Sequence, residues 1–372
     1  MYLKRLEMAN FRNYIRQVIE PGPYFNILVG QNAQGKTNLL ESIYLACTGK
    51  SFRTSKEREA IHWDSEFSTI HSLLETETHQ LEIKLFLQPG KKKILVNGIA
   101  ANRYPLGWPG VVLFTPDDLL LVKGSPQERR RFLDYELGFF QPQYGHYLSR
   151  YYRVLSQRNN LLREIRDKRL KSHALQVWNE QLGRYGAKIL YFRLELLKKF
   201  SPHLRELHLQ LTAGREKFEI KYHSSFKATN IDSEEELFKQ YLKALTTVQE
   251  EEIARAQTLI GPHRDDLSFF LNGADARIYG SQGQQRTVVL TLKISQITQW
   301  KNETSEYPIL LLDDVLLELD RDRRQALLSY VTGTVQTFMT STSSENLKIG
   351  ANVERKLYNI VNGKIIKFSF HI

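Results

Sequence analysis

The stretch Gly30–Thr37, GQNAQGKT, decides the fold, because it fits the pattern G-x-x-x-x-G-K-[ST] at every fixed position. The apolar residues Ile27–Val29 before it predict a buried strand. The run LLESIYLACTG after it has the apolar spacing of a helix. A strand, a glycine-containing loop and a helix in this order indicate an α/β domain.

The residue types of this loop fit phosphate binding. Its glycines let the backbone wrap closely around an anion, and the start of the helix faces that anion with free amides. Lys36 is expected to reach the β and γ phosphates in catalysis, and the Thr37 hydroxyl to coordinate Mg²⁺. The alternative is a chance match. The predicted ATP-binding residues of the loop are Gly30, Gln31, Asn32, Ala33, Gln34, Gly35, Lys36 and Thr37.

A second acidic segment, ILLLDDVLLELD at residues 309–320, supplies a carboxylate for the metal. Four apolar residues predict a buried strand, and in an open α/β sheet ligands lie beyond the carboxyl ends of the strands. We expect Asp313 to hold Mg²⁺, and Asp314 to orient or deprotonate the attacking water as a catalytic residue. The alternative is an ordinary strand that ends in a polar turn.

The turn YGSQGQQRT at residues 279–287 precedes a helix-like run, VVLTLKISQITQW. Ser281 and Gly283 can present hydroxyl and amide donors beside the positive end of that helix. A second phosphate cradle in one chain suggests that two copies each offer this turn to the ATP held by the other. Taken alone, the turn is better explained as a polar turn with a helix N-cap.

The totals set limits on the class of protein. The chain has 372 residues, 41% of them apolar and 25% charged, and a net charge of +11. This length fits two domains, and the basic balance favours a polyanion partner as much as a merely basic surface. The single Cys47 excludes an internal disulfide, and neither a membrane span nor a signal sequence is found. We therefore expect a cytoplasmic protein without a membrane partner.

The pattern along the chain divides it into three segments. Strand and turn signals dominate residues 1–117, including the hairpin around QPGK, and return over 256–372 up to a final hairpin, YNIVNGKIIKF. Residues 118–255 are mostly helical, with one strand, KFEIKYH. We predict an α/β domain built from both chain ends, with an inserted helical lobe and without a long coiled coil.

The loop, turn and acidic strand, in this order, resemble ABC-type ATPases, whose signature turn reads Leu-Ser-Gly-Gly-Gln. Here Gly280 and Gln282 replace the leucine and the first glycine, and Asp314 stands where a glutamate is usual. The chain more closely resembles the RecF family of bacterial DNA replication and repair ATPases, which are recombination mediators related to SMC heads. The motifs that carry this resemblance are LEMANFRNY, VGQNAQGKTNLLESIY, GKSFRTS, KKKILVNG, VLFTPDDLLLVKGSPQERRRFLD, GPHRDD, YGSQGQQR and LLLDDVLLELD.

The resemblance implies a weak DNA-linked ATPase that uses ATP and Mg²⁺ and forms an ATP-dependent homodimer. It implies binding to double-stranded and gapped DNA at single-strand/double-strand junctions, and loading of RecA with RecO and RecR. The signature turn offered to the partner copy would comprise Ser281, Gln282, Gly283 and Gln284.

The resemblance also gives roles to smaller motifs. Arg12 and Asn13, in FRNY, match SMC-type residues near the nucleotide, or form a simple turn between strands. Arg53, in SFRTS, matches an arginine loop that faces nucleotide or DNA. Asp320 matches a loop that reports across the dimer, or is a helix N-cap. Thr340 to Ser343 occupy the place of a γ-phosphate sensor, whereas His263, in GPHRDD, is expected to be structural.

Arginines in the helical segment could contact DNA phosphates, and the tyrosines among them could stack on unpaired bases. The alternative is a solvated helix face with Tyr151 and Tyr152 at core spacing, which the periodicity favours for the tyrosines. The predicted DNA-binding residues are Arg53, Arg129, Arg130, Arg131, Arg150 and Arg153.

Two other functions use the same phosphate loop. A transporter ATPase subunit would need a membrane partner and a smaller helical lobe than the long arginine-rich insert. A small-molecule kinase would act as a monomer with a lid over an acceptor site, and it would not need the turn at residues 279–287.

Overall fold

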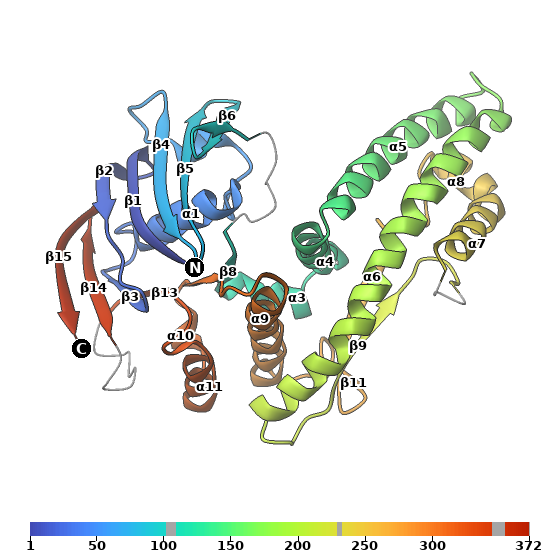
Figure 1. Ribbon diagram of the computed structural model, residues 1–372. Coiled ribbons are helices and arrows are strands. Elements are labelled where there is room, and N and C mark those ends of the chain that lie inside the picture. The colour runs from blue at the N-terminus through green and yellow to red at the C-terminus, as the bar shows by residue number, and fades with distance from the viewer. Residues whose placement is uncertain (102–108, 229–232, 344–353, 372) are drawn as a thin grey trace. The chain divides into compact units, whose positions relative to one another are not determined.

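The computed structural model describes residues 1–101, 109–228, 233–343 and 354–371. The chain forms two compact units, Met1–Asp118 with Leu292–Ile372, and Leu119–Thr291. The first unit therefore combines both chain ends, and the second is an insertion, as the sequence pattern suggests. Figure 1 colours the two ends blue and red and the insertion mainly green and yellow.

The first unit contains two six-stranded sheets. One is antiparallel, and its strands alternate between buried and less buried residues, as in β4, because one face packs on the core. In order across this sheet the strands are β2 (Tyr14–Ile19), β1 (Tyr2–Phe11), β4 (Ser68–Glu75), β5 (Gln80–Gln88), β6 (Lys91–Val96) and β7 (Ile99–Ala100).

The other sheet of this unit is mainly parallel, and all residues of its strand β12 are buried, as expected where helices or a second sheet cover both faces. Only the last hairpin, β14 with β15, is antiparallel. In order across the sheet the strands are β15 (Lys364–His371), β14 (Arg355–Val361), β3 (Phe25–Val29), β13 (Thr337–Ser341), β12 (Ile309–Leu312) and β8 (Val111–Phe114).

Helix α1 (Lys36–Thr48) begins directly after the glycine loop and contacts strands of both sheets. It is buried along most of its length, and its Leu39, Leu40 and Ile43 join a single apolar core with residues of both sheets. Gly49 ends the helix in the left-handed conformation that glycine adopts without strain. The remaining helices of this unit are α2 (Glu57–Ala60), α10 (Val315–Glu318) and α11 (Arg321–Val331).

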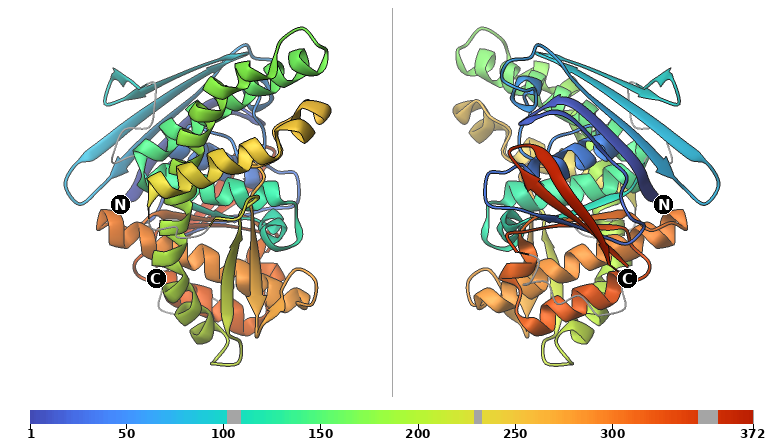
Figure 2. Two further views of the ribbon diagram at one scale, coloured as in Figure 1. Left: turned by 90° about the vertical axis from the view of Figure 1, so that its right-hand side faces the viewer. Right: turned by 90° about the vertical axis from the view of Figure 1, so that its left-hand side faces the viewer.

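The second unit is mostly helical around a three-stranded antiparallel sheet, β11 (Ala274–Asp275), β10 (Asp266–Leu271) and β9 (Phe218–His223). The longest helix, α6 (Leu175–Leu211), packs against its neighbours α5 and α7 and against β9, as Figures 1 and 2 show. The other helices of the second unit are α3 (Leu120–Lys123), α4 (Pro126–Phe140), α5 (Pro142–Arg166), α7 (Glu234–Thr247) and α8 (Gln249–Arg255), with a short 3₁₀ turn at Ser172–Ala174. A further 3₁₀ turn, Pro116–Leu119, spans the division between the units.

Helix α9 (Gln282–Thr304) crosses from the second unit into the first at residue 292. The expected second boundary, between residues 255 and 256, differs from this division. The segment after 255 stays with the insertion because β10 pairs with β9 along six residues and the buried Arg158 binds both Glu252 and Thr258. The first boundary falls after Asp118, next to the expected one after residue 117.

A polar network occupies the centre of the second unit. Arg193 is fully buried and donates to Asp134, to Tyr144 and to the Pro262 carbonyl. The partly buried His263 lies 2.7 Å from the Tyr151 hydroxyl, and burial lowers its pKa to about 4. These contacts give the GPHRDD segment a structural role, as expected for His263.

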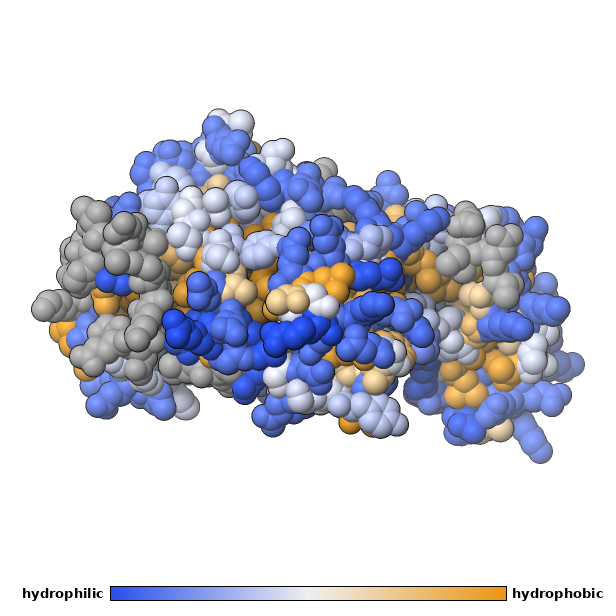
Figure 3. Space-filling model, turned by 90° about the horizontal axis from the view of Figure 1, so that it is seen from below, coloured by the Kyte–Doolittle hydropathy of each residue, from blue (hydrophilic) through white to orange (hydrophobic). Residues whose placement is uncertain are grey.

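In the described parts of the chain, no helix combines the length and apolarity needed to cross a membrane. On the face seen in Figure 3, hydrophobic residues form small groups among hydrophilic ones. The large hydrophobic side chains most exposed in the structure come from separate segments, among them Trp63, Ile99 and Tyr279.

Candidate nucleotide site

The glycine loop connects β3 to α1 and is held by close backbone approaches. A Cβ on Gly30 would lie 2.4 Å from the Ile360 carbonyl oxygen, so only glycine fits there. Gly35 has φ of 116°, and a Cβ on it would lie 2.8 Å from the Asn13 side chain. Both fixed glycines of the motif are therefore required by space or by backbone conformation.

Lys36 is buried, and its ammonium group donates to the loop's own carbonyl oxygens, at 2.7 Å from Gly30 and 2.9 Å from Gln31. Burial lowers its pKa, while the charges of Asp314 and Asp313 act in the opposite direction. The lysine thus lies inside the loop and donates to carbonyl oxygens. Phosphate oxygens would be stronger acceptors for it.

The structure brings Thr37 and Asp313 together, although they are 276 residues apart. The Thr37 hydroxyl donates to Asp313 Oδ1 at 3.1 Å. The Thr340 hydroxyl lies 3.0 Å from an oxygen of Asp313 and 3.0 Å from one of Asp314, and it accepts the Asp314 amide at 2.8 Å. Parallel pairing of β12 with β8 and β13 places these residues at the carboxyl ends of adjacent strands.

The carboxylate of Asp313 is largely desolvated. Burial raises its pKa, and the hydrogen bonds from Thr340 and Thr37 oppose that rise. A hydroxyl beside a buried carboxylate suits Mg²⁺, which takes one or two protein oxygens and completes its shell with water and phosphate. The described residues contain no cluster of three or more His, Cys, Asp or Glu side chains that could cage an ion without phosphate. Thr37 and Asp313 therefore fit the magnesium site expected for them.

Arg12 and Asn13 lie beside the loop but differ in how they are bound. Asn13 donates to the Gln34 carbonyl at 3.0 Å and accepts from Asn38 at 2.8 Å. Arg12 donates to Glu41 from Nε at 2.9 Å and from Nη2 at 2.6 Å, and its Nη1 donates to the Glu59 carbonyl. All three nitrogens of Arg12 thus bind protein, which argues against the nucleotide contact expected for it.

Arg53 lies close to the loop helix. Its Nη1 donates to Asn38 at 2.6 Å and to Glu41 at 3.4 Å, and its side chain is 42% exposed. The positive charge also lowers the pKa of Asp313 as a minor cause. Of the two roles expected for an arginine loop, these neighbours favour the nucleotide over DNA.

The turn before α9 belongs to the second unit. Ser281 accepts the Gln284 amide at 3.2 Å, and Gln284 Oε1 accepts the Ser281 amide at 2.9 Å, which is a reciprocal capping arrangement. Ser281 and Gln282 are exposed, and Gln284 also donates to Glu216 at 3.1 Å. The turn is therefore an N-cap, as one alternative had it, and it also presents a hydroxyl and helix amides to solvent.

Asp320 is the N-cap of α11, since it accepts the Arg323 amide at 2.9 Å. Ser343 donates its amide to Ser341 at 3.3 Å, so the end of β13 forms a local turn. Thr340 alone of the TSTS segment touches both aspartates.

The arginines expected to bind DNA lie in different environments. Arg129 is 2% exposed, pairs with Asp266 through both Nε and Nη2, and donates from Nη1 to the Gly124 carbonyl, which argues against contact with DNA. Arg130 donates to the Asp265 carbonyl, and Arg131 is exposed next to Glu128. Within the described parts of the chain, the exposed side chains of Arg150 and Arg153 have neither an ion pair nor a hydrogen bond.

The tyrosines of α5 lie on different faces of the helix. Tyr151 is fully buried, as the apolar spacing predicts, but the same prediction is wrong for Tyr152, which is 44% exposed. Tyr152 lies between Arg150 and Arg153 in the sequence, so an exposed ring accompanies the two unpaired arginines.

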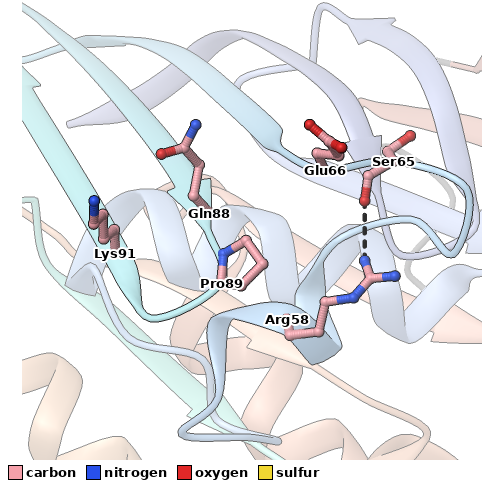
Figure 4. Close-up of a pocket in the computed structure, with 6 residues that line it drawn as sticks. All are labelled: Arg58, Ser65, Glu66, Gln88, Pro89 and Lys91. Carbon is pink, nitrogen blue, oxygen red and sulfur yellow. Dashed lines mark hydrogen bonds between the residues drawn. The ribbon is translucent and has the colours of Figure 1, made fainter.

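A separate hollow of about 460 Å³ lies in the first unit, lined by Arg58, Ser65, Glu66, Gln88, Pro89 and Lys91 (Figure 4). Arg58 points to the Ser65 carbonyl and donates to it at 3.0 Å, and it also donates to the carbonyls of His62 and Trp63. Its guanidinium thus holds the surrounding loop, and the hollow contains none of the predicted site residues.

The sequence analysis missed three residues that build the site. Tyr14 donates to the Gly35 carbonyl at 3.0 Å, Asn38 joins Asn13 to Arg53, and Glu41 binds both arginines from α1. Glu41 stands among apolar helix residues, and this is the one sequence signal that could have marked it as a partner for a nearby cation.

These features define a P-loop ATPase head of the ABC and SMC type, in which a glycine loop and an acidic strand share one sheet edge. A family model for the AAA domain matches residues 5–306. The Smc head domain from Pyrococcus furiosus has the same fold, with a TM-score of 0.54 at 16% identity over 99% of this chain and 96% of that one. The predicted fold class is confirmed.

The chain belongs to the RecF family of DNA replication and repair proteins. It is 56% identical to the "DNA replication and repair protein RecF" of Pelotomaculum thermopropionicum over 98% of this chain and all of that one. The identity to the protein of the same name from Staphylococcus carnosus is 42%, over 99% and 100% of the two chains. A solved structure of the recombination mediator protein RecF with ATPrS matches with a TM-score of 0.90 at 33% identity, over 98% and 97%. The resemblance seen in the motifs is thereby confirmed.

Proposed function

We propose that the chain is an ATP-driven DNA-binding switch of recombinational repair. ATP and Mg²⁺ bind in the loop Gly30–Thr37, and a second copy covers the nucleotide with its turn Ser281–Gln284. The observation that carries the proposal is the hydrogen bond of Thr37 to Asp313 beside the buried Lys36. Lys36 can bind phosphate, and the oxygens of Thr37 and Asp313 can bind a metal ion.

The steps assigned to the chain's own residues follow from this arrangement. The loop amides and Lys36 bind the phosphates, and Lys36 exchanges two carbonyl oxygens for phosphate oxygens. Thr37 and Asp313 would hold Mg²⁺, which would supply positive charge to the phosphate oxygens. Asp314 orients or deprotonates the attacking water, and Thr340 fixes its position through the backbone amide and the carboxylate.

In this proposal hydrolysis releases the contacts between the two copies, because the bound triphosphate is the link between the loop and the partner's turn. Energy is thus used to reset a conformational state. The aspartate at position 314 in place of a glutamate fits a slow turnover. ATP is the nucleotide of choice because the solved relatives are complexes of RecF with ATP and with ATPrS.

The basic chain binds DNA as its polyanion partner, at gaps and single-strand/double-strand junctions. The surface for it includes Arg150, Arg153 and the exposed Tyr152 on α5, because these arginines have charge that no described carboxylate neutralises. RecO and RecR are the expected partners and RecA the recombinase that is loaded, in the cytoplasm, because the solved relative is a recombination mediator in the RecFOR pathway.

Sedimentation and DNA binding, each measured without nucleotide, with ADP and with ATP, test the proposal. Wild type should form a dimer and bind DNA tightly only with ATP, and Lys36→Met should do neither. DNA affinity should fall steeply with salt. Equal behaviour of wild type in all three nucleotide conditions would refute the switch.

A further inference from the structure

We propose that Glu41 is a positioning residue of the nucleotide site, which fixes Arg12 as an anchor and holds Arg53 ready to move onto the bound phosphates. The inference rests on the proposed binding of ATP to the glycine loop, and it assigns a task to a carboxylate outside the motif.

Glu41 is a fully buried carboxylate on α1 with three different side chains around it. Arg12 donates two hydrogen bonds to it, at 2.6 and 2.9 Å, the Ser51 hydroxyl donates one at 2.5 Å, and Arg53 lies at 3.4 Å. A buried carboxylate needs such partners, because leaving it unpaired is costly. Glu41 therefore ties the segments that carry these three residues to helix α1.

The two arginines are bound unequally. Every nitrogen of Arg12 has an acceptor within the protein, and the side chain is 16% exposed. Arg53 is 42% exposed, and its contacts with described residues use Nη1 alone, which leaves Nε and Nη2 for a ligand. Arg12 is thus the fixed partner of Glu41, and Arg53 is the exchangeable one.

A chain of hydrogen bonds connects Arg53 to the phosphate loop. Arg53 donates to Asn38 Oδ1, Asn38 donates to Asn13, and Asn13 donates to the Gln34 carbonyl. Asn38 is two residues after Lys36 on α1, so the guanidinium lies near the start of that helix, where the phosphates would bind.

The balance of charges favours transfer of Arg53 to a phosphate. Glu41 is one carboxylate that faces two guanidinium groups, so it does not neutralise both. A neutral amide at 2.6 Å and a carboxylate at 3.4 Å hold Arg53 less strongly than a bidentate phosphate would. Ser51 keeps the segment within reach, because its hydroxyl accepts the amides of Arg53 and Thr54 while it donates to Glu41.

A double-mutant cycle on ATP affinity tests the inference, with Glu41→Gln, Arg53→Gln and the double variant of the full chain. Equilibrium binding of ATP with Mg²⁺ is measured together with the melting temperature. Each single variant should bind ATP about tenfold more weakly, and the double variant should bind no more weakly than either, because both remove the same contact. Arg58→Gln is the matched control, since Arg58 binds only backbone carbonyls in the same unit and its loss should leave ATP affinity unchanged.

Ser51→Ala gives a second route if Glu41→Gln does not fold. It frees the Arg53 segment from Glu41 while the Arg12–Glu41 pair remains, and it should also weaken ATP binding without adding to Arg53→Gln. Additive losses, or a lowered melting temperature with unchanged ATP affinity, would overturn the inference. Failure of wild type and Arg58→Gln to bind ATP would instead refute the proposed function itself.

Discussion

The phosphate loop and the signature turn both precede a helix start, but the protein holds them in opposite ways. The loop is fixed from several elements, since its Gln34 carbonyl accepts from Asn13 and from the Gly363 amide, and its Gly35 carbonyl accepts from Tyr14. The turn is fixed mainly by itself, through the reciprocal bonds of Ser281 and Gln284.

The contrast between loop and turn bears on the proposed site shared by two copies. The loop has Lys36, both fixed glycines and the contact of Thr37 with Asp313 in place. The turn presents exposed donors to solvent, which is what contact with a nucleotide held by another copy requires. An exposed turn that rests on few contacts can also adapt when a partner arrives. The contrast supports the head-to-tail pairing proposed above.

The largest effect is expected for the loop side of the comparison. Asp313→Asn should lower ATP turnover about 100-fold or more, because it removes the charge that faces the metal. Steady-state phosphate release with increasing Mg²⁺ measures the effect. Asp322→Asn, a like change on the exposed start of α11, is the control, and turnover equal to wild type in Asp313→Asn would contradict the proposed metal role.

Asp313→Asn should lower ATP turnover but raise the stability of the folded protein. Burial raises the pKa of Asp313, so its charged form is disfavoured in the folded protein. The protein therefore loses stability as the pH rises from the ordinary pKa of an aspartate through the raised pKa of the folded state. Without nucleotide and metal, Asp313→Asn should therefore melt at a higher temperature than wild type at pH 7. The gain should disappear below the ordinary pKa of an aspartate, where both proteins are neutral at this position.

The next effect tests the turn. Ser281→Arg should leave ATP binding by single copies unchanged and weaken ATP-dependent assembly about tenfold or more, because a bulky cation replaces the exposed hydroxyl. Sedimentation over a range of protein concentrations measures assembly. Ser329→Arg adds the same charge at an exposed position of α11 and should assemble normally. Normal assembly of Ser281→Arg would contradict the proposed contact between the turn and the partner's nucleotide.

Local chemistry made the loop predictable from the sequence. Its strand, glycines, Lys36 and Thr37 are contiguous, and the parallel-sheet rule correctly brought Asp313 to the same edge. The hairpins β5–β6 and β14–β15 were likewise marked by short turn signals.

Long-range partners could not be predicted. Periodicity gave no sign that Arg129 turns inward to Asp266, 137 residues away, or that Arg150 and Arg153 have no ion-pair partner among the described residues. Charge alone made these arginines equivalent. The second domain boundary failed to appear in the composition for the same reason, because it depends on β10 pairing with β9 and not on a local change in residue types.

Within the second unit, the exposed Arg150 and Arg153 can be compared with the buried Arg129. The double variant Arg150→Gln/Arg153→Gln should lower the slope of log affinity against log salt by about 1–2, because up to two phosphate contacts are lost. Arg129→Gln should keep the slope and instead destabilise the protein by about 2 kcal/mol, since it breaks a charged pair with Asp266. Filter binding at several salt concentrations and thermal melts separate the two outcomes. A slope that changes only in Arg129→Gln would reverse the assignment.

A threefold effect, smaller than the others, is expected for the contact between Gln284 of the turn and Glu216. Glu216 accepts from Gln284 with Oε1, and its Oε2 lies 3.2 Å from His208, whose other ring nitrogen contacts Thr291 further along α9. Glu216→Gln removes the charge from this support, so the turn should loosen and assembly with ATP should weaken about threefold, as for one modest hydrogen bond. ATP binding by single copies should not change, because the loop has its own supports. A loss of ATP affinity as large as the loss of assembly would mean that the loop depends on the second unit, and that the two halves are not held independently.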